Sequence, residues 1–331
     1  MRLLTYILFC FLTMGVFGQE TEYVTSTKTL KLMGTRFDIT VVAINQDIGQ
    51  INIDEATAEI RRIEALISSW NPDSETSLIN KNAGIHPVKV SLELFKLIGK
   101  ANQISQITDG AFDISYASMD EIWKFDGSMK RKPTDAELEK SIAKIGYQKI
   151  IMNENDQTVF LKEKGMKISF GAIGKGYAAD KAKELLISKQ VVGGIINAAG
   201  DLTTWGTRPD GEKWLIGIAN PLSKEKIFSW LPIVESSVAT SGNYEKFVVF
   251  DGIKYSHIID PRTGYPATGM NSVSIFAKSA AFCDALATAV FIMGKEAGLA
   301  RINQLPDTEA ILVDSDNKIH KSSGILFETT P

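Results

Sequence analysis

The stretch YSHIIDPRTGYP, residues 255–266, places several chemically active side chains in one short bend. The chain has only three histidines, and one of them, His257, lies three residues before Asp260. Asp260 begins an Asp-Pro-Arg-Thr-Gly turn, which adds a guanidinium and a hydroxyl group. An imidazole or a carboxylate in such a bend could act as a general base. The alternative is structural, with Asp260 capping the turn and His257 packing in a strand.

A second candidate site lies in the apolar segment SAAFCDALATAVFIMG, residues 279–294. Ser279 suits the N-cap of a helix and Gly294 its end, so we expect a helix that is buried on all sides. Asp284 is its single charged residue, and Thr288 lies one turn later on the same face. A buried carboxylate needs compensation, and Mg²⁺ could bind both side-chain oxygens. A cap or an ion pair with a neighbouring loop is the alternative.

A glycine-rich turn, MKISFGAIGKGYAADKAKELL at residues 166–186, leads from an expected strand into a helix. From Gly174 it matches G-x-G-x-x-A, and Asp201 follows the next strand, as in dinucleotide-binding Rossmann folds. Three residues, however, separate the expected strand from that glycine, and an exported protein would rarely meet NAD. The spacing also differs from a Walker loop. Lys175 beside a helix N-terminus nevertheless suits a phosphate group; a plain strand-helix connection is the alternative.

Four further positions carry weaker signals. In DGAFDIS, residues 109–115, two aspartates bracket a small turn. In SSWNPDSETSLIN, residues 68–80, Trp70 precedes an Asn-Pro-Asp turn, where its ring could stack on a flat ligand or cap the core. Asp201 and Ser241 lie where loops leave strands, which is where ligands usually bind.

These side chains must be positioned by regular elements, which the hydrophobic spacing predicts. We expect helices over residues 53–70, 91–108 (capped by Ser91), 134–146 (capped by Thr134 and stopped by Gly146), 174–189 and 279–293. We expect strands at residues 37–44, 147–152, 157–161, 166–170, 193–198, 213–218, 246–250, 253–259 and 272–277. The mixture predicts an α+β fold with a mixed or antiparallel sheet and flanking helices. The charged loop 124–135 is a possible lobe boundary.

Composition and charge restrict the class of protein. The chain has 331 residues, of which 44% are hydrophobic, and a net charge of −3, which argues against a nucleic-acid partner. Residues 1–18 have the pattern of a secretory signal peptide, so we expect an exported domain over residues 19–331. A retained membrane anchor is the alternative. Cleavage would leave Cys283 as the remaining cysteine, which we expect to be buried and structural.

The ordered set of motifs resembles one family, the FAD:protein FMN transferases, also called the ApbE family. The resemblance extends from about Leu32 to about Leu312. It rests on LMGTRFDITV, SSWNPDSETSLIN, TDGAFDIS, FGAIGKGYAAD, INAAGDL, VATSGNYEKF, YSHIIDPRTGYP and CDALATAVFIMG.

The resemblance implies a T-fold-like α+β structure that works outside the cytoplasmic membrane, in the periplasm. Family members bind FAD with Mg²⁺, cleave its diphosphate, release AMP, and attach FMN through its phosphate to a threonine of a target protein. Targets include exported subunits of quinone reductases and related electron-transfer proteins. Some members hydrolyse FAD to FMN and AMP. Flavin transfer, FAD hydrolysis and flavin binding without catalysis therefore all remain open.

The resemblance also implies roles for individual residues. The residues expected to contact FAD are Met33, Trp70, Ala111, Phe112, Asp113, Lys175, Asp180 and His257. The expected metal ligands are Asp284, Thr288 and a backbone carbonyl near Ala172. His257 and Asp260 are the candidates for the base that deprotonates the acceptor hydroxyl. Two positions depart from the family pattern: Ala199 stands where glycine is common, and Ser169 where many members carry aspartate.

Overall fold

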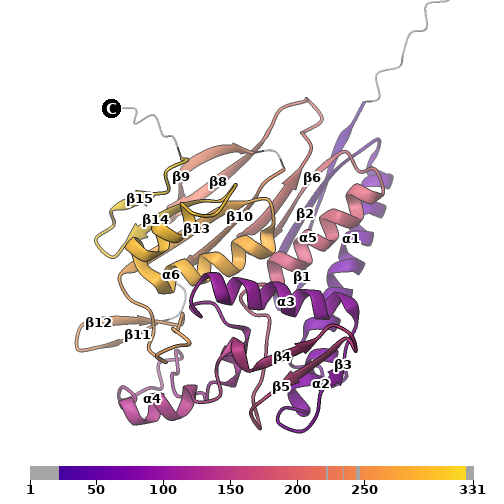
Figure 1. Cartoon of the computed structure of the whole chain (residues 1–331). Coiled ribbons are helices and arrows are strands. Elements are labelled where there is room, and N and C mark those ends of the chain that lie inside the picture. Colours follow the sequence, from indigo (N-terminus) through magenta and orange to yellow (C-terminus); the bar gives the residue numbers. More distant parts are fainter. Residues whose placement is uncertain (1–21, 221–222, 234, 244–246, 326–331) are drawn as a thin grey trace, which may run out of the picture.

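The computed structural model describes residues 22–220, 223–233, 235–243 and 247–325. Its centre is an eight-stranded sheet that three long helices cover on one face (Figure 1). The strand order is β1 (Val24–Leu32), β2 (Thr35–Ala43), β6 (Gly193–Ala198), β7 (Asp201–Trp205), β10 (Ser237–Gly242), β13 (Met270–Ala277), β14 (Glu309–Asp314) and β15 (Ile319–Lys321). All strand pairs among the described residues are antiparallel, so the prediction of an α+β fold with an antiparallel sheet is confirmed.

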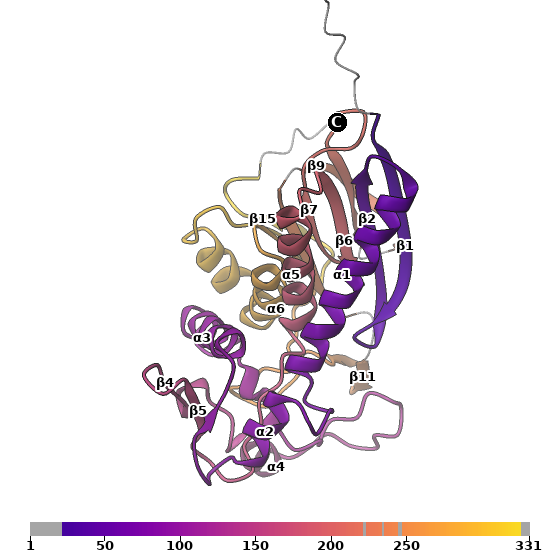
Figure 2. The same cartoon turned by 90° about the vertical axis from the view of Figure 1, so that its right-hand side faces the viewer.

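Two of the covering helices are α1 (Gln46–Ile67) and α5 (Gly174–Ser188), which lie side by side across the sheet (Figure 2). Helix α1 begins before the predicted residue 53 because the Asn45 side chain accepts a hydrogen bond from Ile48 N–H and caps the helix. Isoleucines at helical spacing, Ile53, Ile60 and Ile63 among them, are buried against the sheet and α5.

The third covering helix is α6 (Ala280–Ile302), with Ser279 as its N-cap, as predicted. Gly294 interrupts the helix with φ 77° and ψ −179°. Since that conformation favours glycine, the helical segment that Gly294 was predicted to end does end there, and a second segment follows directly. Nearly all side chains of the first segment are buried, including Asp284 and Cys283.

Helix α3 (Leu92–Ile107) lies beside α6, and smaller elements form the end of the molecule that is lowest in Figures 1 and 2. They are α2 (Glu75–Lys81), β3 (Val88–Lys89), η1 (Ile114–Ser118), α4 (Asp135–Ile142), η2 (Tyr147–Lys149), β4 (Ile150–Asn153) and β5 (Thr158–Leu161). Ser91 caps α3 and Thr134 caps α4, both as predicted. Helix α4 ends at Ile142, before the Gly146 that was expected to stop it.

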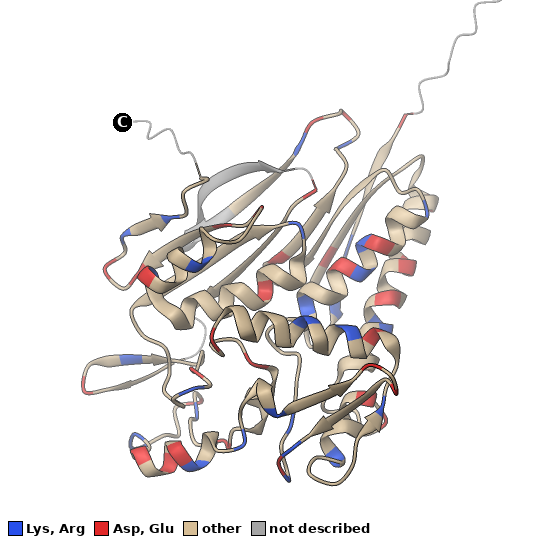
Figure 3. Ribbon diagram, in the orientation of Figure 1, with Lys and Arg blue, Asp and Glu red and all other residues tan. Residues whose placement is uncertain are grey.

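Two hairpins complete the fold. The first, β8 (Trp214–Asn220) with β9 (Ser223–Ile233), covers the other face of the sheet, where Ile216 packs with Leu202 and Val238. The second, β11 (Phe247–Phe250) with β12 (Ile253–Ser256), packs on a separate aromatic cluster around Trp123 and Tyr255. Acidic and basic residues are interspersed along the outer helices and loops (Figure 3).

The strand predicted at residues 166–170 is wrong, because this described segment is extended but pairs with no neighbouring strand. Its backbone groups bond to side chains and to the first residue of η1 instead. The Asn80 amide bonds both the N–H and the carbonyl of Ile168, the Ser118 hydroxyl accepts from Lys167 N–H, and Ser169 N–H donates to the Ile114 carbonyl. The backbone N–H and carbonyl groups of this segment thus find hydrogen-bond partners although the segment joins no sheet.

Several elements were not predicted, among them β1, β7, β14 and α2. Strand β1 is mostly polar, because it forms an edge of the sheet and exposes alternate side chains. Among the residues described, no helix is long and apolar enough to cross a membrane. The predicted signal peptide, residues 1–18, lies outside the described residues.

Candidate active site

A cavity of about 490 Å³ lies where the ends of β7 and β10 meet α5 and α6. It brings together residues from segments that are far apart in the sequence. Its walls include most of the residues predicted from the motifs, namely Ala111, Phe112, Asp113, Ala172, Lys175, His257, Asp284 and Thr288.

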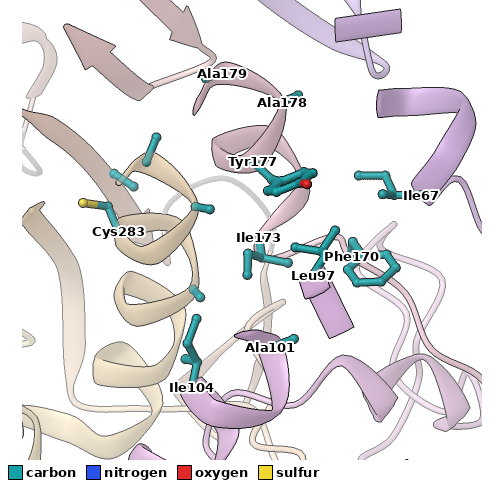
Figure 4. Packing of buried hydrophobic residues seen from close by; sticks show 14 of the residues in the cluster. Ile67, Leu97, Ala101, Ile104, Phe170, Ile173, Tyr177, Ala178, Ala179 and Cys283 are labelled. Atoms are coloured by element: carbon teal, nitrogen blue, oxygen red, sulfur yellow. The ribbon is translucent and has the colours of Figure 1, made fainter. Parts of the chain in front are cut away.

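The glycine-rich turn owes its composition to a close contact between α5 and α6. A Cβ on Gly176 would lie 2.3 Å from the Ala280 carbonyl oxygen, so the two helix backbones meet at this point. Figure 4 shows Ile173 and Tyr177, at the start of α5, between α6 and the side chains of Leu97 and Ile67. The contact brings Lys175 and Asp284 to one cavity. The Rossmann alternative is wrong, because the described sheet is antiparallel and no strand precedes the turn.

Lys175, Asp201 and Asp284 form a charged cluster inside the cavity. The Lys175 Nζ lies 2.9 Å from Asp201 Oδ2 and 3.4 Å from Asp284 Oδ2. Both carboxylates are buried, with side chains 8% and 7% exposed, and the lysine side chain is 28% exposed. No local sequence pattern pairs this lysine with the two carboxylates, since they lie 26 and 109 positions further along the chain.

Burial determines the protonation behaviour of this cluster. It raises the pKa of Asp201 to about 7; the nearby Asp284 charge acts in the same direction, and Lys175 opposes both. Burial also raises the pKa of Asp284, against the effects of Lys175 and the Gly176 N–H. For Lys175, burial disfavours the charged form, but the two carboxylates outweigh it and raise the pKa. The lysine is therefore held as an ammonium group.

The cavity offers oxygen ligands to a hard cation. The Asp284 Oδ2 accepts two long contacts of 3.4 Å, from Lys175 Nζ and Gly176 N–H, and its Oδ1 has no hydrogen bond within the described residues. Thr288 Oγ1 lies 3.3 Å from Ser241 Oγ, and Ala172 is part of the same wall. An incompletely satisfied carboxylate with a hydroxyl, in a wall that also includes Ala172, fits Mg²⁺. Among the described residues, no group of three or more His, Cys, Asp or Glu could hold a metal ion, so substrate and water would have to complete the coordination.

Asp113 is fixed by its neighbours and orders the wall around it. Its Oδ1 accepts from the N–H and the hydroxyl of Ser115, at 2.8 and 2.6 Å, and its Oδ2 accepts from Tyr147 N–H at 2.7 Å. Burial raises the pKa of the Asp113 carboxyl, and these three hydrogen bonds oppose the rise. The carboxylate thus holds the turn so that Ala111 and Phe112 line the cavity.

The two candidate bases, His257 and Asp260, have different surroundings in the structure. His257 forms part of the cavity wall, directly after β12. Asp260 lies in the turn that follows, where its carboxylate accepts hydrogen bonds from Arg262 N–H, Nε and Nη2 at 2.9, 2.8 and 2.7 Å. The structural interpretation of Asp260 as a turn cap therefore matches its surroundings, whereas His257 can face a ligand.

Met33 and Trp70 line a second cavity of about 970 Å³. The two cavities adjoin, because Ser169, Gly171 and Lys175 belong to the walls of both. The Trp70 side chain is 94% exposed, so the alternative that Trp70 caps the core is wrong. An exposed aromatic ring at the rim of a cavity can stack on a flat ligand.

Asp180 lies away from both of these cavities, at the N-terminus of α6. Its carboxylate accepts from the Ser279 hydroxyl and from the N–H groups of Ala280 and Ala281, at 2.7, 2.8 and 3.0 Å. These contacts satisfy backbone donors that the first turn of a helix leaves unpaired. The structure thus gives Asp180 a capping position, and its contact with FAD stays a prediction.

Some cavity residues were not among those predicted from the motifs. Asp201 and Ser241 had been noted at strand ends but had received no role, and Tyr116 carried no sequence signal. Ala199, which replaces a glycine common in the family, also lines the cavity with φ 55°. Because L residues rarely adopt that conformation, the turn explains why glycine is favoured there.

Comparisons with known proteins find relatives along most of the chain. The sequence profile described as the ApbE family matches residues 33–312. A protein of Klebsiella pneumoniae (strain 342) named FAD:protein FMN transferase is 34% identical over 285 residues, covering 84% of this chain and 88% of that protein. A protein of Treponema pallidum (strain Nichols) with the same name is 29% identical, covering 83% of this chain and 80% of that protein.

Solved structures agree with these relatives. The crystal structure of the ApbE protein from Thermotoga maritima matches with a TM-score of 0.82 and 30% identity, covering 91% of this chain and 97% of that one. The flavin transferase ApbE from Vibrio cholerae matches with a TM-score of 0.79 and 25% identity, covering 91% and 98%. The similarity therefore includes the sheet, its helices and the segments that form the cavity.

Proposed function

Because this chain belongs to the ApbE family, we propose that it is an FAD:protein FMN transferase. The reaction moves FMN from FAD to an acceptor protein. The observation that carries the proposal is the cavity in which Lys175, Asp284, Thr288 and His257 meet, since these groups can bind and act on a diphosphate.

The paired cavities suit a dinucleotide. FAD has two flat ring systems joined by a diphosphate, and the two cavities adjoin at Lys175. We place the diphosphate near the Lys175 ammonium group, with one ring system directed toward Trp70 and the other toward the Ala111 and Phe112 wall. An ammonium group beside phosphate oxygens offsets their charge and orients them.

The residues present fit Mg²⁺, which would be held by Asp284, Thr288 and the carbonyl of Ala172. When bound, the cation neutralises negative charge on the phosphate oxygens. The protein's own contribution is to keep the Asp284 carboxylate buried and incompletely hydrogen-bonded, so that it is ready to bind. Burial of the site excludes water and strengthens these interactions.

The acceptor in this proposal is a threonine of an exported electron-transfer protein. Its hydroxyl oxygen attacks the phosphorus of the FMN half, and a new phosphoester bond forms. The bond between that phosphorus and the bridging oxygen breaks, and AMP leaves with this oxygen. His257 takes the hydroxyl proton as general base and passes it to solvent.

Two alternatives use the same cavity. If water replaces the threonine hydroxyl, the products are FMN and AMP, and the protein is an FAD hydrolase. If neither nucleophile reacts, it is a flavin-binding protein. We also propose that residues 1–18 direct export, so that the enzyme works in the periplasm, at the outer face of the cytoplasmic membrane.

The experiment mixes the purified protein with FAD, Mg²⁺ and a candidate acceptor from a neighbouring gene. Mass spectrometry of the acceptor and chromatography of AMP then distinguish the three functions. Transfer predicts an acceptor heavier by one FMN less one water, together with an equal amount of AMP. AMP without a modified acceptor would favour hydrolysis. If no AMP forms with any acceptor or with water alone, the protein binds flavin without catalysis.

A further inference from the structure

The charged cluster contains an ammonium group that two buried carboxylates share unequally. Lys175 Nζ is 2.9 Å from Asp201 Oδ2, a normal distance for a charged hydrogen bond, but 3.4 Å from Asp284 Oδ2. The lysine therefore favours Asp201, although Asp284 is just as buried and just as much in need of a partner. The carboxylate with the weaker partner is the one that fits a cation.

Asp201 is held firmly in this position. It is the first residue of β7, where it pairs with Ala198 of β6. The turn before it is fixed by Gly200 N–H, which donates to Asn197 Oδ1 at 2.8 Å. A carboxylate on a paired strand makes a rigid anchor for the flexible lysine side chain.

A lysine near a cation site would normally be an obstacle. An ammonium group that pairs closely with Asp284 would occupy its oxygens and repel a divalent ion. A second carboxylate solves both problems, because it binds the lysine and offsets its charge. Lys175 can then remain in the cavity for the diphosphate while Asp284 remains accessible.

We propose that Asp201 is a positioning residue that holds the Lys175 ammonium group away from Asp284 and so keeps Asp284 available to a divalent cation. The inference rests on the proposed function, since it assumes that Asp284 binds the cation. In Asp201→Asn, Lys175 loses its closer partner and moves onto Asp284. The affinity for the cation then falls, and this loss can be measured in the absence of FAD and of any reaction.

A competing explanation must be separated from this one, because Asp201 could itself be a metal ligand. Asp201→Asn would weaken binding in either case. The double variant Lys175→Met/Asp201→Asn distinguishes the two. It removes one positive and one negative charge together, so the net charge of the cluster stays that of the wild type, and no lysine competes for Asp284.

The test measures binding of Mn²⁺ alone, as a paramagnetic substitute for Mg²⁺, by the loss of the free-ion EPR signal. We expect Asp201→Asn to bind Mn²⁺ at least about tenfold more weakly than wild type. The double variant should recover most of the wild-type affinity. Asp54→Asn is the matched control, since Asp54 pairs with Lys28 at the same 2.9 Å on the exposed surface. Thermal unfolding shows whether each variant is folded.

Each result has a distinct meaning. If the double variant binds as weakly as Asp201→Asn, Asp201 is a ligand and the positioning role is wrong. Equal binding by wild type and Asp201→Asn would also overturn the inference, but would leave the proposed function intact. If wild type binds no better than Asp284→Asn, the cation role itself fails. A crystal structure of metal-free Asp201→Asn supports the proposal if Lys175 Nζ lies within about 3 Å of the Asp284 carboxylate, and opposes it if the lysine stays in place.

Discussion

At the scale of single residues, the site depends on how the buried negative charge of Asp284 is compensated. Burial raises the pKa of its carboxyl, and the contacts that oppose the rise, from Lys175 and Gly176, are both long. Its negative charge also raises the pKa of Asp201. Charges that catalysis needs are thus kept in the fold at a cost to stability, as is common in active sites.

We therefore predict opposite effects of Asp284→Asn on activity and stability. AMP release should fall roughly 100-fold or more, because the anionic oxygen that fits a cation is lost. The unfolding temperature of the metal-free protein should stay the same or rise, since an amide needs no charge compensation and Lys175 keeps Asp201. Chromatography of AMP and thermal unfolding measure the two effects. Full activity in this variant would contradict the cation role of Asp284.

His257 and Asp260 should differ in the same assays. His257→Gln should slow transfer to the acceptor roughly 100-fold, because the base near the cavity is lost. Asp260→Asn should reduce transfer much less and should change the free energy of unfolding by about 1 kcal/mol or less, since it removes a partly exposed ion pair with Arg262. Single-turnover transfer with saturating FAD is the measurement. If Asp260→Asn slowed transfer more than His257→Gln did, Asp260 would be the general base.

At the scale of elements, the contact between α5 and α6 aligns the site. Gly176 allows the two helices to meet, and Lys175 on α5 and Asp284 and Thr288 on α6 line the same cavity. Asp180 strengthens this contact, because a side chain of α5 caps the N-terminus of α6. The glycine-rich motif is thus a packing device as well as the phosphate site that we propose.

Gly176→Ala should separate the two helices. The new methyl group would lie 2.3 Å from the Ala280 carbonyl oxygen, so we expect a loss of about 1–3 kcal/mol in the free energy of unfolding and slower AMP release. Gly99→Ala on α3 is the matched control. Its methyl group would meet Met152 Cε at 3.6 Å, an ordinary contact, so stability should stay the same or rise. Urea unfolding compares them, and equal effects of both substitutions would refute the contact argument.

Asp180→Ala should act on stability and leave the FAD site in place. It removes the acceptor for two N–H groups and one hydroxyl at the start of α6, which should cost roughly 1–2 kcal/mol. Fluorescence titration with FAD should give an affinity close to that of wild type under conditions where the variant is folded. A large loss of affinity without a loss of stability would restore the original expectation that Asp180 contacts FAD.

At the scale of the whole molecule, the sheet gathers strand ends and helix ends at one cavity. Segments on β7, β10, α5 and α6 and the loop after β12 all contribute to its wall. A second cavity adjoins it and extends to Trp70, which is why we propose that the two cavities together bind the two ring systems of FAD. The antiparallel sheet provides the rigid platform that this arrangement needs.

The N-terminal segment provides a prediction at this scale. Residues 1–18 fused to a reporter enzyme that is active only outside the cytoplasm should give full reporter activity, because an apolar run after Arg2 is read as an export signal. A chain that lacks these residues should stay in the cytoplasm, and after purification it should transfer FMN normally. Reporter activity without residues 1–18 would contradict the signal-peptide hypothesis.

How much the sequence could predict differs between elements. The caps at Ser91, Thr134 and Ser279 are local interactions, so their helices were predicted from a few neighbouring residues. The extended segment at residues 166–170 was misread as a strand, because its partners, Asn80 and Ser118, are distant in the sequence. Alternation predicts an extended chain, but only a neighbour decides whether that chain joins a sheet.

The same distinction applies to the site. The sequence by itself determined the family, the α+β class and several residues of the cavity wall, because ordered motifs and local hydrophobic spacing can be recognised without a structure. Only the tertiary structure decided that Lys175 pairs with Asp201 in preference to Asp284, that Asp180 caps a helix and that Asp260 belongs to a turn. The physical reason is distance: electrostatic and hydrogen-bonded roles depend on separations of a few ångströms between residues that the chain itself places far apart.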